Sequence, residues 1–106
     1  MNAIINTKLI LEDGIVFDGA ITFEDGVIRQ LGKASEVSIP EDAVIYDAGG
    51  RYTTPGLIDI HNHGGYGYDY MDNTVEAFEN ILRFHSDNGI TSAIASTVTA
   101  PQETIE

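Results

Sequence analysis

Two histidines separated by one residue, His61 and His63, are the side chains of this sequence that most clearly suggest a chemical role. A neutral imidazole is a common ligand of divalent zinc or iron, and no other side chain changes charge so readily near neutral pH. The pair follows a short apolar run, residues 57–60, which Pro55 and Gly56 separate from the preceding chain. The run is rich in strand formers and too short for a helix, so it predicts a buried strand.

Successive side chains of a strand point to opposite faces, so we expect His61 and His63 to share a face, about 7 Å apart along the backbone. Asn62 then points away, and Asp59 lies one step earlier on the histidine face. Residues 64–67 are rich in glycine and predict a loop directly after the pair. The pattern predicts two metal ligands at the end of a strand. The alternative is a pair that only packs against its neighbours or faces solvent.

Residues 55–64, Pro-Gly-Leu-Ile-Asp-Ile-His-Asn-His-Gly, resemble the first barrel strand of the amidohydrolase superfamily. These enzymes are metal-dependent hydrolases built on a (β/α)8 barrel. Residues 61–72, through their glycines and through Asp69, Met71 and Asp72, resemble more specifically the N-acetylglucosamine-6-phosphate deacetylase family. The resemblance implies metal-dependent hydrolysis of the acetamide of N-acetylglucosamine 6-phosphate to glucosamine 6-phosphate and acetate.

The resemblance also implies site residues and partners. His61 and His63 match the first-strand metal ligands, and zinc or iron is the expected divalent metal. A small phosphorylated amino sugar is the expected substrate. The other ligands, a glutamate and two histidines, and the catalytic aspartate would lie beyond Glu106, so no catalytic residue is assigned within this chain.

The length of the chain limits what it can do alone. A (β/α)8 barrel needs roughly 200 residues or more, and the chain has 106. We therefore expect a truncated N-terminal part of the enzyme, without deacetylase activity of its own and with weak metal affinity, since two histidines fall short of the usual three or four zinc ligands.

The resemblance implies the fold class α/β, with residues 1–53 as part of a β-sandwich and residues 54–106 as the first β-α-β unit of the barrel. Asp13-Gly14 and Asp25-Gly26 lie between apolar runs and predict tight turns of an antiparallel sheet. The expected strands of the first part are residues 3–11, 15–17, 20–24, 27–31 and 43–48.

Residues 73–86 carry apolar side chains at helical spacing and predict a helix after the histidine strand. Asn73 is the expected N-cap, with Glu76 completing a capping box, and Gly89 is expected to end the helix. We expect His85 on the core-facing side of this helix rather than as a metal ligand.

Residues 90–99 are predicted to form a second strand, which Pro101 ends. Like residues 57–60, this strand is patterned for burial on both faces, as in a parallel barrel, so without the rest of the barrel we expect unpaired apolar edges. Thr97 and Thr99 would lie at its C-terminal end, where barrel enzymes place functional groups. They are candidate substrate contacts, although they could instead satisfy loop backbone groups. Tyr66, Tyr68 and Tyr70 could line a sugar pocket or pack beneath the loop.

The net charge of −12 argues against nucleic-acid or anionic-membrane binding, because no basic patch is present. The basic residues form no evident phosphate clamp; they are Lys8, Arg29, Lys33, Arg51 and Arg83. The chain has no cysteine and no signal-like segment, which favours a cytoplasmic location.

Unpaired apolar strand edges recruit other chains, so we expect a homo-oligomer. Two other functions stay open. One is a different amidohydrolase, dihydroorotase-like or dipeptidase-like. The other is a non-catalytic β-rich interaction module with vestigial histidines.

Overall fold

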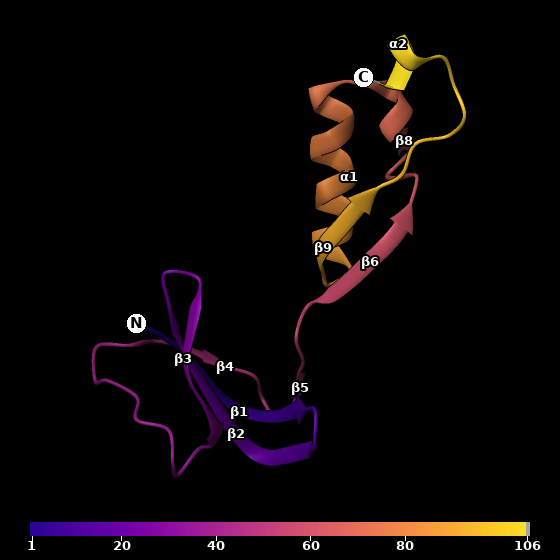
Figure 1. Ribbon diagram of the computed structural model, residues 1–106. Coiled ribbons are helices and arrows are strands. Elements are labelled where there is room, and N and C mark those ends of the chain that lie inside the picture. The colour runs from indigo at the N-terminus through magenta and orange to yellow at the C-terminus, as the bar shows by residue number, and fades with distance from the viewer. Residues whose placement is uncertain (106) are drawn as a thin grey trace. The chain divides into compact units, whose positions relative to one another are not determined.

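The computed structural model describes residues 1–105, which are mostly β-structure with one long helix (Figure 1). The chain divides into two compact units, Met1–Pro55 and Gly56–Glu106. Their assignment to two domains of a longer enzyme stays a prediction. No helix in the described part of the chain is both long enough and apolar enough to cross a membrane.

The first unit is one sheet in the order β3-β2-β1-β4, with β5 also paired to β1. Strands β1 and β2 are antiparallel, as are β2 and β3, whereas β4 and β5 run parallel to β1. The strands are β1 (Asn2–Leu11), β2 (Gly14–Glu24), β3 (Val27–Lys33), β4 (Val44–Asp47) and β5 (Tyr52–Thr53).

Both predicted hairpins are confirmed, although the first turns at residues 12–13, with Gly14 already in β2, and only the second turns at Asp25-Gly26. Asp25 and Gly26 have φ angles of 52° and 75°, the left-handed conformations that a two-residue hairpin turn requires. Separate strands over residues 15–17 and 20–24 are wrong, because β2 runs unbroken through Asp18 and Gly19. At Gly19 an added Cβ would lie 2.5 Å from Cγ of Leu9, so glycine lets β1 and β2 approach closely there instead of ending the strand.

The core of the first unit is small and includes a buried hydroxyl pair. Ala3, Leu9 and Ala20 are buried. Buried Thr7 places its Oγ1 2.6 Å from Oγ1 of Thr53 and donates to the backbone oxygen of Arg51 at 3.0 Å. This contact ties β5 to β1, a pairing that the sequence did not predict.

In the second unit, β6 (Leu57–Asn62) and β9 (Ile90–Ala95) pair in parallel, with helix α1 (Val75–Asp87) between them in the chain. This strand-helix-strand order confirms the prediction from the sequence. Helix α1 runs alongside β9 (Figure 1). Short elements complete the unit: β7 (Gly64–Gly65), β8 (Tyr68–Asp69), the 3-10 helix η1 (Tyr70–Asp72) and α2 (Gln102–Ile105).

The predicted cap of the helix is wrong by one residue. Thr74 is the N-cap of α1, and its Oγ1 accepts from the backbone N–H of Ala77 at 3.1 Å. Asn73 instead ends η1 in the left-handed conformation, with φ 49° and ψ 43°. A capping box does exist, but between Asp69 and Asp72 at the start of η1. The predicted end of α1 is confirmed, since Gly89 has φ 78°.

The second strand is shorter than predicted. It ends at Ala95, so Thr97 and Thr99 lie in the irregular segment after it. Apolar side chains patterned for burial face solvent on both strands, as expected for barrel strands without their neighbours: Ile94 on β9 is 57% exposed, and Ile58 and Ile60 on β6 are 70% and 73% exposed. The physical reason is that β6 and β9 pair only with each other within residues 1–105.

Candidate metal-binding site

The imidazoles of His61 and His63 lie side by side after the apolar part of strand β6. Their ring centroids are 5.0 Å apart and the ring planes are nearly perpendicular, at 88°. Both side chains are exposed. Strand alternation places them on one face, as the sequence predicts, since His61 is the fifth residue of β6 and His63 follows its end.

Both imidazole rings contact Ser96, each through its own Nδ1 atom. Nδ1 of His63 lies 3.1 Å from the backbone oxygen of Ser96, and Nδ1 of His61 lies 3.2 Å from its Oγ. Within residues 1–105, no hydrogen bond occupies Nε2 of either histidine. The two Nε2 atoms are therefore the groups left to bind an ion or a proton.

The side chains of the other polar residues of the strand, Asp59 and Asn62, bond to groups other than the two imidazole rings. Oδ1 of Asp59 accepts from the backbone N–H of His61 at 3.0 Å, so this carboxylate stays beside the histidines. Asn62 turns away, as predicted. Its Nδ2 donates to the backbone oxygen of Ile94 at 3.3 Å, and its Oδ1 lies 3.0 Å from Nε2 of His85.

His85 occupies the helix face expected for it. The side chain is 3% exposed, and its bond to Asn62 spans helix α1 and strand β6. Because an amide oxygen can only accept, Nε2 of His85 carries the hydrogen of this bond. Nδ1 of His85 is buried and has no hydrogen-bond partner within the described part of the chain.

The glycine-rich loop after the histidines is held against helix α1. The hydroxyl of Tyr66 donates to Asp87 at 3.0 Å, and that of Tyr68 donates to Glu76 at 2.9 Å. Each acidic partner, first through the hydrogen bond and then through its charge, raises the pKa of its tyrosine above the ordinary value of 10.0. These tyrosines thus hold the loop on the helix.

Tyr70 also contacts helix α1, through aromatic packing. It is buried, and its ring centroid lies 5.3 Å from that of Phe78 on α1. Burial raises the pKa of Tyr70. Of the two alternatives for the tyrosine cluster, packing beneath the loop accounts for the observed contacts.

Two glycines allow the tight path of this loop. A Cβ on Gly64 would lie 1.9 Å from the backbone oxygen of Tyr68, and one on Gly65 would lie 2.4 Å from Cδ1 of Phe84. Glycine is therefore required at both positions, so that β7 can pair with β8 and pack against α1. The loop begins directly beside His63, whose backbone oxygen accepts from the N–H of Tyr70 at 3.0 Å.

The residues present fit part of a metal site. Two imidazoles with free Nε2 atoms suit zinc or iron, and a ring spacing of 5.0 Å is compatible with both rings reaching one ion at a Zn–N distance of about 2.0–2.1 Å. However, no group of three or more His, Cys, Asp or Glu side chains able to hold a metal occurs within residues 1–105. His61 and His63 could thus supply two of the three or four protein ligands that zinc usually takes.

The candidate substrate threonines lie close in sequence but do not join the pair. Thr97 and Thr99 are exposed and follow the end of β9, and in the described residues no hydrogen bond links either to His61 or His63. Ser96 is the residue that sequence reasoning missed. Its signal was present, since a hydroxyl residue near the end of the paired strand can meet side chains at the end of β6, but the prediction carried that strand to residue 99.

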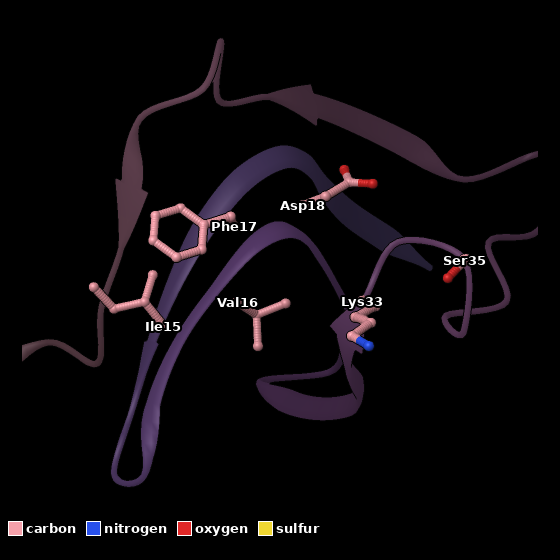
Figure 2. Close-up of a pocket in the computed structure, with 6 residues that line it drawn as sticks. All are labelled: Ile15, Val16, Phe17, Asp18, Lys33 and Ser35. Atoms are coloured by element: carbon pink, nitrogen blue, oxygen red, sulfur yellow. The ribbon is translucent and has the colours of Figure 1, made fainter.

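A separate pocket in the first unit offers no comparable chemistry. It has a volume of about 340 Å³, and Figure 2 shows the six side chains that line it along β2, at the end of β3 and just beyond. They are Ile15, Val16, Phe17, Asp18, Lys33 and Ser35. The lining is largely apolar and contains no histidine, so the histidine pair remains the candidate site.

Comparisons with known proteins show which enzymes the chain resembles in sequence. No protein-family model matches the chain. The N-acetylglucosamine-6-phosphate deacetylase of Bacillus subtilis is 30% identical over 98 residues, covering 86% of this chain and 23% of that protein. The imidazolonepropionase of Cupriavidus pinatubonensis is 34% identical over 103 residues, covering 88% of this chain and 23% of that protein.

One solved structure shares the fold of the chain. The N-acetylglucosamine-6-phosphate deacetylase of Pasteurella multocida superposes with a TM-score of 0.87 at 23% identity, over 98% of this chain and 27% of that chain. At that identity the match shows a shared fold. The chain spans about a quarter of the length of each of these three proteins. In both sequence and fold, the chain matches the N-terminal quarter of amidohydrolases.

Proposed function

We propose that this chain is the N-terminal part of a metal-dependent amide hydrolase in which His61 and His63 are metal ligands. The observation that carries the proposal is the histidine pair itself: two adjacent rings, both held at Nδ1 and both free at Nε2. Ligating histidines commonly use one ring nitrogen for the metal and the other for a hydrogen bond that orients the ring. The match to amidohydrolases supports the same role.

The proposed reaction is removal of the acetyl group from N-acetylglucosamine 6-phosphate, giving glucosamine 6-phosphate and acetate. A bound zinc or iron ion supplies polarisation of the amide carbonyl and a lowered pKa of water. His61 and His63 would bind the metal through the lone pairs of their Nε2 atoms, and the loop that starts at Gly64 lies next to them. We also propose that other parts of a longer enzyme supply the general acid, the phosphate clamp and the further metal ligands. A cytoplasmic location is part of the same proposal.

An imidazolonepropionase-like activity is the second candidate. Its support is specific, because the Cupriavidus pinatubonensis relative is 34% identical over nearly the same share of the chain as the deacetylase of Bacillus subtilis. The longer resemblance over residues 61–72 favours the deacetylase. A dihydroorotase-like enzyme and a non-catalytic module have no such support. A dipeptidase-like enzyme is supported only by the fold of a solved prolidase-like structure from Bifidobacterium longum, at 28% identity and a TM-score of 0.65.

The first test is metal binding by the purified 106-residue chain. We expect zinc to bind and the His61→Ala, His63→Ala double variant to lose it, measured by elemental analysis after dialysis and by calorimetric titration. The His85→Gln variant is the matched control, because it removes the third histidine and should keep the metal. Equal zinc in the wild type and the double variant would overturn the ligand assignment.

The second test concerns the substrate and the chain's own activity. We expect N-acetylglucosamine 6-phosphate, but not the imidazolonepropionase substrate, to shift the NMR signals of His61 and His63 in the zinc-loaded chain. The reverse pattern would favour the second candidate. Acetate release by the isolated chain should be undetectable, since residues 1–105 hold no third metal ligand beside the pair, and measurable turnover would contradict that expectation.

A further inference from the structure

We propose that Ser96 is the positioning residue of the histidine pair: its two oxygens hold both rings at Nδ1, which leaves both Nε2 atoms for a metal ion. The metal-binding role in this inference rests on the proposed function, whereas the two hydrogen bonds of Ser96 do not depend on it. One residue contacts both rings, at 3.1 Å through its backbone oxygen and at 3.2 Å through Oγ.

The backbone fixes Ser96 at this place. It is the first residue after β9, and its N–H donates to the backbone oxygen of Asn62 at 3.1 Å, which extends the pairing of β6 and β9 by one bond. Asn62 stands between the two histidines in the chain. Ser96 is therefore held opposite the pair by the register of the two parallel strands, and it is partly shielded from solvent.

The contact with His63 determines which nitrogen carries the hydrogen. A backbone carbonyl can only accept, so Nδ1 of His63 must be the donor. Nε2 of His63 then keeps its lone pair, which is the form that binds a metal. Because the acceptor belongs to the backbone, a substitution of the Ser96 side chain leaves this bond in place.

The contact with His61 depends on the side chain. The hydroxyl of Ser96 can donate to Nδ1 or accept from it, and only acceptance leaves the lone pair of Nε2 free. A metal on Nε2 selects that arrangement. Removal of the hydroxyl should therefore free the ring of His61 and leave its hydrogen position unspecified, while His63 stays as it was.

The experiment uses the 106-residue chain and two measurements. Long-range proton–nitrogen NMR on the metal-free protein reports which nitrogen of each ring carries the hydrogen. Titration with zinc reports affinity. In Ser96→Ala we expect changed nitrogen shifts for His61, unchanged shifts for His63, and a zinc affinity lower by about 10–100-fold.

Two variants separate positioning from a general structural effect. Ser96→Thr keeps the hydroxyl and should restore both the shifts of His61 and the zinc affinity. Ser92→Ala removes an exposed hydroxyl from the same strand and should change neither. A wild-type protein in which His63 carries its hydrogen on Nε2 would overturn the proposal, as would a Ser96→Ala variant with unchanged His61 shifts and zinc affinity.

Failure of the proposed function would look different. If the wild-type chain binds no zinc, the ligand assignment of His61 and His63 fails. The nitrogen shifts of the metal-free protein still decide the role of Ser96, because they report the two hydrogen bonds without any metal.

Discussion

Nε2 of His85 lies 3.0 Å from Oδ1 of Asn62, so helix α1 is bonded to the residue that stands between the two candidate ligands. The bond is partly buried, and His85 is 3% exposed. A buried pair of this kind costs more to break than an exposed one, because the group left behind loses its partner away from water.

We expect His85→Leu to lower the free energy of unfolding by about 1–3 kcal/mol, since Oδ1 of Asn62 loses its donor. Urea denaturation followed by helical circular dichroism measures the change. Asn88→Ala, which removes an exposed bond to the backbone oxygen of Phe84, is the control and should cost less. A double-mutant cycle with Asn62→Ala should give a coupling of about 0.5–1.5 kcal/mol, and a coupling near zero would contradict the role of this bond.

The bond from Tyr68 to Glu76 predicts that the stability of the folded loop depends on pH. The pKa of Tyr68 is raised, so its neutral form is favoured in the folded state. The resulting stabilisation is complete below the unfolded-state pKa of about 10 and is lost as the pH rises through the higher folded-state pKa. Glu76→Gln should lower the pKa of Tyr68, measured by ultraviolet titration of tyrosine with NMR assignment. Glu79→Gln should leave it unchanged, and an equal effect of both variants would contradict the prediction.

The start of helix α1 predicts opposite outcomes for two neighbouring residues. Thr74→Ala removes the cap that accepts from Ala77 and should cost about 1 kcal/mol of stability. Asn73→Gly should be neutral or stabilising, because Asn73 already has a left-handed backbone with φ 49°. Thermal unfolding monitored at the helix band measures both. Were Asn73 the true N-cap, the two results would be reversed in order.

The loop glycines give a matched pair of substitutions. Gly64→Ala places a Cβ 1.9 Å from the backbone oxygen of Tyr68 and should cost roughly 3 kcal/mol or more. Gly67→Ala meets open space, so only its backbone conformation with φ 81° resists the change, at about 1 kcal/mol. Urea denaturation distinguishes the two. Equal costs would show that the hairpin of β7 and β8 does not constrain the loop.

The exposed apolar strand predicts association. Ile58 and Ile60 are 70% and 73% exposed on β6, which pairs only with β9 within residues 1–105. We expect the chain to oligomerise in light-scattering measurements and the Ile58→Lys, Ile60→Lys double variant to shift it toward the monomer. Val75→Lys, at a 75% exposed helix position, is the control. A wild-type monomer that binds no apolar dye would contradict this expectation.

Local chemistry let the sequence predict much of this protein. The Asp25-Gly26 turn follows from the need for positive φ at two successive residues, which asparagine, aspartate and glycine tolerate best. The shared face of His61 and His63 follows from the two-residue period of a strand. Helix α1 and its end near Gly89 follow from apolar spacing and from the backbone freedom of glycine. None of these features needs a partner distant in the chain.

Tertiary structure decided the remainder, because each remaining feature depends on which segments meet. Asn73 and Thr74 can both cap a helix, but Asn73 is the C-cap of the 3-10 helix η1, so Thr74 caps α1. Ser96 became the partner of both histidines only through the register of β9 on β6, and register is set by long-range pairing rather than by the local sequence. The sequence alone therefore identified the two candidate ligands, whereas the pairing of the strands determined which residue holds them.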